Sequence, residues 1–237
     1  MNRSVTNIIR FFLDECVPPL IRDSKFFMYP FYLVWFKGSG INFIMNFKSH
    51  VNKLSEEEFQ NVYRELKTLA VDRPTDLNLP SVNYMLKNLE PTAETMLDVG
   101  CGRGYWLNKV AGTTPGLKLT GCDLYDNVLL NNANYAKANI ENLPFADKTF
   151  DIVTCHHTIE HVRNLEKAIS ELRRVTKQQL IIATPCQRYY YYTLDLHIHF
   201  FPEESSLENV IRMKHFSCKK LSGDWVYIGS QSKGDDS

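Results

Sequence analysis

The 237-residue sequence has few cysteines, and they lie far apart. No two of them form a CxxC pair, and their spacing lacks the density of a small disulfide-stabilised domain. A disulfide framework is therefore excluded, and a reducing compartment is expected. The six cysteines are Cys16, Cys101, Cys122, Cys155, Cys186 and Cys218.

The sequence also lacks a hydrophobic run long enough to cross a membrane. Its most apolar segment, residues 26–36, is shorter than the ~20 residues that a membrane helix needs, and Pro30 interrupts it. The order of basic, apolar and small residues of a secretory signal is missing, because Asp14 and Glu15 break the first apolar stretch. We therefore expect a cytoplasmic protein without a transmembrane segment.

An excess of one charge is the third absence. Lysine plus arginine and aspartate plus glutamate number 27 each, so the formal net charge is zero. Strong attraction to a phosphate backbone is not expected, and the sequence carries no strong nucleic-acid signal. The length suits one α/β domain with an extension.

Two regions of different pattern meet near residues 80–91. Residues 1–80 are rich in aromatic side chains, and Ser55 followed by three glutamates predicts a helix over about 56–70. Residues 81–230 alternate short apolar strands with amphipathic helices, whereas the polar tail 231–237 is predicted to be disordered. The first region is expected to form a helical cap on the second.

Short strands separated by helices indicate a mainly parallel sheet covered on both faces, which binds ligands beyond the carboxyl ends of its strands. Two further strands joined by a turn at residues 222–224 predict an antiparallel carboxyl-terminal edge. The predicted strands are 95–99, 118–122, 152–155, 179–183, 213–220 and 225–229.

The segment Met96–Gly104 places Asp98 at a strand end and three alternating glycines in the turn beyond it. Glycines tolerate positive φ and let the backbone approach a ligand closely. The pattern is ambiguous by itself, since dinucleotide-binding domains and ordinary turns also contain it. Asp123 ends the next strand, where its carboxylate can accept hydrogen bonds from both ribose hydroxyls, a feature shared with NAD-binding proteins.

Three downstream motifs decide between these alternatives: Asn139 to Phe145 with its LPF turn, Phe150-Asp151 at a strand start, and Glu160-His161-Val162. Together with the glycine-rich loop they resemble the class I S-adenosylmethionine-dependent methyltransferases of the small-molecule type. The resemblance covers roughly residues 92–230. It implies an α/β fold with a Rossmann-like, seven-stranded, mainly parallel sheet, S-adenosyl-L-methionine as cofactor and S-adenosyl-L-homocysteine as product.

The resemblance also assigns cofactor-binding residues. Asn139 departs from the aspartate that family members often carry, so its contact with the adenine would lose charge assistance. The implied cofactor-binding residues are Asp98, Gly100, Cys101, Gly102, Asp123, Leu124, Asn139, Ile140 and Cys155.

Histidines cluster where an acceptor is expected, and His157, His161 and His199 are candidate catalytic bases for a hydroxyl or amine acceptor. A structural role for each single histidine is the competing interpretation. The i, i+3, i+4 spacing of residues 157, 160 and 161 also permits a metal site of His157, Glu160, His161 and His197, which resembles that of metal-assisted O-methyltransferases.

The expected function is therefore methyl transfer to a small-molecule acceptor, which could be a sugar or a lipid-linked compound. The alternatives are a non-catalytic partner protein that keeps the fold, a metal-assisted O-methyltransferase and an NAD-dependent oxidoreductase. Residues 189–192, four tyrosines, either stack on a substrate ring or pack against the amino-terminal helices. The aromatic run 26–47 forms a buried cap or a surface for peripheral membrane contact. The oligomeric state is left open.

Overall fold

The computed structural model describes residues 8–231 except positions 10, 39, 66–72 and 127. The chain divides into two compact units. The helical unit combines residues 1–76 with the segment Gln187–Phe200, and the sheet unit combines residues 77–186 with 201–237. The sequence expectation placed the boundary after residue 80 and kept 187–200 in the second domain. The four predicted strands at 95–99, 118–122, 152–155 and 179–183 all form.

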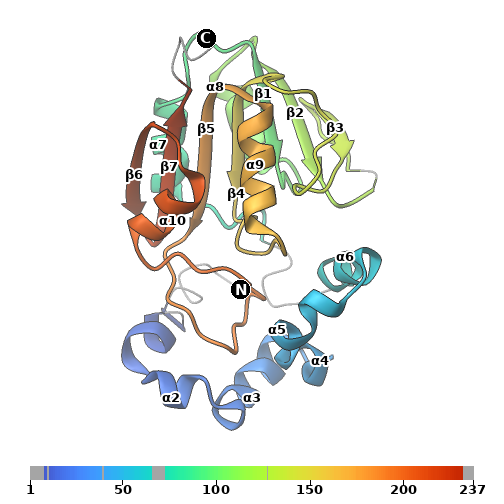
Figure 1. Cartoon of the computed structure of the whole chain (residues 1–237), viewed down its shortest axis with the longest axis vertical. Coiled ribbons are helices and arrows are strands. Elements are labelled where there is room, and N and C mark those ends of the chain that lie inside the picture. The colour runs from blue at the N-terminus through green and yellow to red at the C-terminus, as the bar shows by residue number, and fades with distance from the viewer. Residues whose placement is uncertain (1–7, 10, 39, 66–72, 127, 232–237) are drawn as a thin grey trace. The chain divides into compact units, whose positions relative to one another are not determined.

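The sheet unit contains a seven-stranded sheet of order β3-β2-β1-β4-β5-β7-β6 (Figure 1). The first five strands of this order are parallel, and β7 runs antiparallel to both β5 and β6. The predicted Rossmann-like sheet with an antiparallel edge is confirmed. The strands are β1 (Thr95–Val99), β2 (Lys118–Asp123), β3 (Asn134–Lys137), β4 (Phe150–His156), β5 (Thr176–Pro185), β6 (His215–Leu221) and β7 (Asp224–Ser230).

Helices cover both faces of this sheet because successive strand residues point to opposite sides. One apolar layer contains Leu97 and Val153 and packs under helices α9 and α10. The other contains Met96 and Ile152 and packs under helices α7 and α8. The four helices are α7 (Leu79–Lys87), α8 (Tyr105–Thr113), α9 (Leu165–Val175) and α10 (Glu204–Ile211).

The FD motif has a structural role at the amino ends of the strands. One Asp151 carboxylate oxygen accepts hydrogen bonds from the amides of Glu94 and Thr95 at 3.0 and 3.1 Å, and the other lies 3.0 Å from Lys177 Nζ. These partners outweigh burial and hold the pKa of Asp151 well below its usual range. Asp151 therefore joins β4 to the start of β1 and to β5, at the end of the sheet opposite the predicted site.

The helical unit has an apolar core of its own, which contains Met28, Tyr32 and Phe47. The segment Gln187–Phe200 packs into this core, and Tyr32 Oη donates a 2.7 Å hydrogen bond to the carbonyl of Thr193. The helices are η1 (Phe12–Cys16), α2 (Pro19–Arg22), α3 (Lys25–Trp35), α4 (Ile41–Met45), α5 (Phe47–His50), η2 (Val51–Lys53) and α6 (Glu56–Glu65).

Two expectations fall partly outside the described residues, and one strand of the sheet was not expected. Helix α6 is described as far as Glu65, and the rest of the helix expected over 56–70 lies outside the described residues, as does most of the tail 231–237. Strand β3 was not predicted, because its four residues lack an apolar pattern and are exposed or half-buried at the sheet edge. Within the described residues, no helix has the length and hydropathy needed to cross a membrane.

Candidate functional site at the carboxyl ends of the parallel strands

The glycine-rich turn follows β1 and leads into α8. Gly100 and Gly102 have φ values of 75° and 51°, a region that side-chain-bearing residues rarely adopt. A Cβ atom at Gly100 would overlap the side chain of Thr158, whereas a Cβ at Gly102 would meet no atom within 4 Å. The turn is therefore tight on the side of the β4 loop and open at Gly102, where a ligand can approach the backbone.

Asp123, at the end of β2, is held by this turn. Its Oδ2 accepts a hydrogen bond from the Gly102 amide at 2.9 Å, and its Oδ1 accepts one from the Leu124 amide at 2.7 Å. Burial raises the pKa of Asp123, and the two amides oppose that rise. Each carboxylate oxygen keeps a lone pair, so the oriented group can still accept hydrogen bonds from two neighbouring hydroxyls.

Asp98 lies at the end of β1 and is buried. Its Oδ1 accepts a 2.7 Å hydrogen bond from Thr154 Oγ1 and lies 3.5 Å from His156 Nδ1. Burial raises the pKa of Asp98 to about 7 and lowers that of His156 to about 3. His156 is thus neutral at physiological pH, with its ring edge against Trp106 at a centroid distance of 5.1 Å.

The segment after β3 forms a tight turn in which Asn139 Oδ1 accepts from the Glu141 amide at 2.8 Å. Glu141 Oε1 in turn accepts from the amides of Arg163 and Asn164 at 2.9 and 3.0 Å. The turn is therefore anchored to the amino end of α9. One lone pair of the Asn139 side-chain carbonyl is already used, which further limits what it can offer to an adenine.

The LPF turn is fixed by the ELRR segment of α9. Glu171 Oε2 accepts from the Leu143 amide at 2.7 Å, and Arg174 donates to the carbonyls of Leu143 and Phe145 at 3.0 and 2.7 Å. Two sequence motifs that lie thirty residues apart thus stabilise each other. Their shared role is to shape the strand-end surface.

Cys155 is one of the predicted cofactor-binding residues. It lies near the end of β4 and is almost fully buried in the apolar layer beneath α9. Ile140 is buried in the same layer, and Cys101 lies against the glycine turn, where Cys101 Sγ is 3.7 Å from the carbonyl oxygen of Gly102. Cofactor contacts of these three residues stay predictions.

His157 occupies a buried charged cluster. Its Nδ1 lies 3.4 Å from Glu160 Oε1, and its Nε2 lies 3.5 Å from Asp224 Oδ2. Burial alone would lower the pKa of His157, but the two carboxylates outweigh burial and raise it to about 10. A group that is already protonated at neutral pH cannot act as a general base. A structural role as a cation is therefore favoured for His157, because both of its ring nitrogens face carboxylates. Its roles as a base and as a metal ligand stay predictions.

The other predicted histidines are divided between the units. His161 is half-buried in the loop after β4, and its amide donates to the Thr158 carbonyl at 3.0 Å. His197 and His199 belong to the helical unit, where His197 Nδ1 lies 2.7 Å from Gln187 Oε1. The structure brings His157, Glu160 and His161 together in one loop. The four-residue metal site stays a prediction.

Asp224 and Asn78 are site residues that sequence reasoning missed. Asn78 caps the amino end of α7, where its side-chain oxygen accepts from the Ser81 amide. Its Nδ2 donates a 2.6 Å hydrogen bond to Asp224 Oδ2, the oxygen that faces His157. Asp224 was interpreted only as part of a turn. No local pattern indicates the partners of Asp224, because His157 and Asn78 lie 67 and 146 residues away from it in the sequence.

The four tyrosines at 189–192 lie in the helical unit and pack there. Tyr190 is buried, with the guanidinium of Arg22 lying 4.7 Å from its ring centroid, whereas Tyr189 is exposed. The packing interpretation thus accounts for Tyr190.

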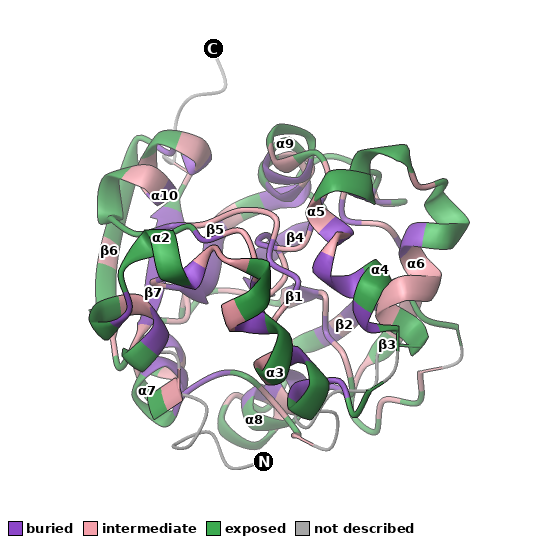
Figure 2. Cartoon of the chain, turned by 90° about the horizontal axis from the view of Figure 1, so that it is seen from below, coloured by how far each residue is buried: buried purple, intermediate pink, exposed green. Residues whose placement is uncertain are grey.

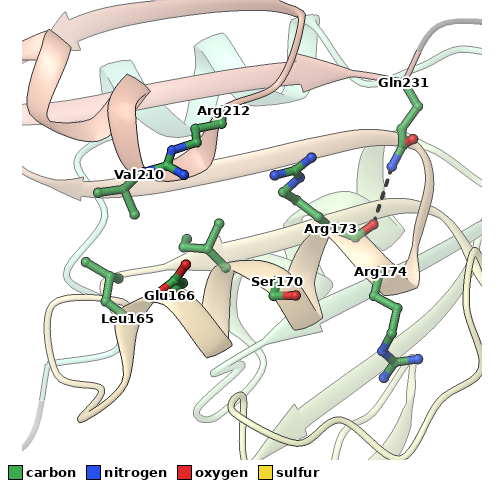
Figure 3. Close-up of a pocket in the computed structure, with 9 residues that line it drawn as sticks. Leu165, Glu166, Ser170, Arg173, Arg174, Val210, Arg212 and Gln231 are labelled. Atoms are coloured by element: carbon green, nitrogen blue, oxygen red, sulfur yellow. Dashed lines mark hydrogen bonds between the residues drawn. The ribbon is translucent and has the colours of Figure 1, made fainter.

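A hollow of about 700 Å³ lies between α9 and α10 in the sheet unit (Figure 3). Leu165, Val210 and Arg212 contribute to its lining, and Gln231 Nε2 donates a 3.3 Å hydrogen bond to the Arg173 carbonyl at one end. The residues that line this hollow include none of the predicted site residues. The strand-end loops therefore remain the candidate site.

Comparison with known families finds a match to the methyltransferase domain model over residues 97–183. Among curated relatives, a malonyl-[acyl-carrier protein] O-methyltransferase of Buchnera aphidicola is 34% identical over 102 residues, or 40% of each chain. A ubiquinone/menaquinone biosynthesis C-methyltransferase of Shewanella pealeana is 41% identical over 61 residues, which cover 26% of this chain and 24% of that protein. The chain spans about half the length of the first curated relatives it matches.

Among solved structures, a SAM-dependent methyltransferase from Aquifex aeolicus has the same fold, with a TM-score of 0.53 and 18% identity. The match covers 68% of this chain and 94% of that protein. The likeness extends beyond the residues of the family match, in agreement with the seven-stranded sheet.

Proposed function

We propose a methyl-transfer reaction for this chain, whose sheet unit is a class I S-adenosylmethionine-dependent methyltransferase domain by its family match and its strand order. The acceptor in this proposal is a hydroxyl or amine of a small molecule. The observation that carries the proposal is the pairing of Asp123 with the Gly102 and Leu124 amides at the open side of the glycine turn.

The charges at the strand ends favour S-adenosylmethionine over a dinucleotide. Asp98, Glu160 and Asp224 are buried there, and His157 supplies one positive charge against them. A pyrophosphate would be repelled by an anionic Asp98, whereas the ammonium and sulfonium of S-adenosylmethionine would be attracted to it. The oxidoreductase alternative therefore loses support.

The residues present fit this cofactor. The backbone at Gly100 and Gly102 would lie along its methionine part, Asp123 would accept from both ribose hydroxyls, and Asn139 with Ile140 would face the adenine. The sulfonium supplies a methyl group that is already activated for displacement. The chain's task is to hold an acceptor in line with that methyl and to exclude water.

Removal of the acceptor proton is assigned to His161. His157 is protonated at neutral pH, and His156 faces Asp98 from a buried position, so His161 is the histidine of the β4 loop that remains for this role. The Glu160–His157–Asp224 cluster holds the loop that carries it. In this proposal His157 is a positioning residue, and a metal ion is not required.

Isothermal titration with S-adenosylmethionine tests the cofactor assignment. Asp123→Ala removes two charge-assisted hydrogen bonds and is expected to weaken binding by at least tenfold. Asp126→Ala is the matched control, because Asp126 is paired with Lys137 on the surface, and it should bind as the native chain does. Absence of binding by the native chain would overturn the proposal and favour a non-catalytic partner protein.

The acceptor is sought by mass spectrometry of a metabolite extract incubated with methyl-labelled cofactor. With an acceptor in hand, His161→Asn should lower kcat by at least tenfold while cofactor affinity is retained. His215→Asn, on exposed strand β6, serves as the matched control. Equal kcat values for the two variants would remove His161 from the proposed mechanism.

A further inference from the structure

Helix α3 has apolar side chains on two faces. Met28, Tyr32 and Trp35 are buried in the core of the helical unit. On the other face, Phe26 is 91% exposed and Val34 is 68% exposed. A helix that is apolar on all sides is usually buried or in contact with a membrane, so the exposed face of α3 is expected to contact another surface.

The exposed side chains form one continuous stripe. Phe26, Tyr29, Pro30, Leu33 and Val34 follow the i, i+3, i+4, i+7, i+8 spacing of a single helix face, and all of them are exposed. The neighbouring helix α2 contacts α3 and adds Leu20 and Ile21, of which Leu20 is 89% exposed. Figure 2 colours the exposed residues of α2 and α3 green. We call these seven residues the α2–α3 stripe.

The charges around the stripe are basic. Exposed lysines stand at both ends of α3, Lys25 immediately before Phe26 and Lys37 three residues after Val34, and residues 24–40 contain no acidic side chain. From residue 11 to residue 54 the sequence has five basic and three acidic side chains. Lysines at the ends of an apolar helix can extend to anionic headgroups while their stems stay on apolar surface.

The three acidic residues of this region have partners within the helical unit. Asp14 lies 3.8 Å from Arg22, and Glu15 lies 3.6 Å from Arg188. Asp23 accepts a 2.6 Å hydrogen bond from the Tyr191 amide. Each acidic side chain thus has a partner inside the unit, and Lys25 and Lys37 are the charges at the two ends of α3.

We propose that the α2–α3 stripe docks on the surface of an anionic lipid bilayer. Helix α3 has 11 residues and is ~16 Å long, too short to span a bilayer and suited to lying in its interface. Exposed phenylalanine and tyrosine beside terminal lysines are the combination that the bilayer interface accommodates. This surface would bring the methyltransferase domain to membranes irrespective of which acceptor it uses.

Sedimentation of the full chain with vesicles tests the proposal. The native chain should bind vesicles of phosphatidylcholine and phosphatidylglycerol, and the double variant Phe26→Ser, Val34→Ser should lower the partition coefficient by at least about tenfold. Lys25→Gln combined with Lys37→Gln should lower it by about tenfold on these vesicles and leave binding to pure phosphatidylcholine unchanged.

A matched pair controls for the loss of an exposed leucine. Leu20→Ser should weaken vesicle binding, whereas Leu129→Ser, at a site in the sheet unit that is 92% exposed, should not. Equal binding by the native chain and the double variant would overturn the proposal. A native dimer that the double variant dissociates, without vesicle binding, would assign the stripe to a second copy instead. Titration of the variants with S-adenosylmethionine separates this outcome from failure of the proposed function.

Discussion

The sheet unit and the helical unit use their side chains in opposite ways. In the sheet unit, carboxylates at the strand ends are buried or half-buried and are held by amides, a threonine, an asparagine and a histidine. In the helical unit, apolar side chains remain open to solvent. Among the residues that the structure describes, eleven of the fifteen large exposed hydrophobic side chains belong to the helical unit.

This difference indicates where a functional site is expected in each unit. Buried charged groups are costly unless they are paired, so the paired carboxylates at the strand ends mark the candidate site of the sheet unit. Exposed apolar side chains contribute little to the stability of the fold that bears them, so their gathering on α2 and α3 indicates contact with something else.

The largest expected effect is on the stability of the sheet unit. Asp224→Ala removes the carboxylate that accepts from the Asn78 side-chain amide and faces one ring nitrogen of His157. Loss of one partner of a buried ion pair typically costs ~3 to 5 kcal/mol. Urea unfolding measures this loss. Asp147→Ala removes an exposed partner of Arg174 and should cost below ~1 kcal/mol. Similar values for the two variants would contradict the buried-charge interpretation.

The next effect concerns the glycine turn. Gly100→Ala forces an alanine into positive φ and drives its Cβ into Thr158, so we expect a loss of ~2 kcal/mol or more together with weakened cofactor binding. Gly116→Ala shares the positive φ but meets no atom within 4 Å, and should cost ~1 kcal/mol without affecting the cofactor. Thermal unfolding measures the stability of the two variants, and titration measures their cofactor affinity. A Gly100→Ala variant with native stability and affinity would contradict the close contact between the turn and Thr158.

A smaller effect is a dependence of cofactor affinity on pH. Burial raises the pKa of Asp98 to about 7, and a cationic cofactor favours the ionised carboxylate, so binding releases a proton. Affinity should therefore rise by up to ~10-fold per pH unit below pH 7 and level off above it. Titrations at pH 6, 7 and 8 measure this trend. In Asp98→Asn the affinity should be lower, and its rise with pH below pH 7 should disappear. A rise as steep as that of the native chain would show that another group releases the proton.

The smallest effect is expected on the exposed face of α3. Phe26→Ser should change the free energy of unfolding by less than ~0.5 kcal/mol, because that side chain is almost fully exposed. Met28→Ala, two residues along the same helix, empties part of the core and should cost ~2 to 5 kcal/mol. Unfolding curves of the two variants show whether the exposed face of α3 contributes to the stability of the fold. A large loss in Phe26→Ser would mean that the stripe is part of the core.

Much of the sheet unit could be predicted from local pattern. Four of the five parallel strands and the glycine turn follow from residues that stand close together in sequence, and the structure places Asp123 against that turn. His157 could not be assigned in this way. Burial lowers the pKa of its neighbour in sequence, His156, whereas the pKa of His157 is raised, because only His157 lies between two carboxylates.

The sequence by itself determined the class of fold, the resemblance to a family and the glycine turn after β1, because periodicity, turn chemistry and motif spacing are local properties. The tertiary structure alone placed His157 between two carboxylates, Asp224 against Asn78, and Gln187–Phe200 in the helical unit. It also separated the buried face of α3 from its exposed stripe, which are equally apolar in sequence. These properties depend on burial and on partners brought together by folding, which no local pattern encodes.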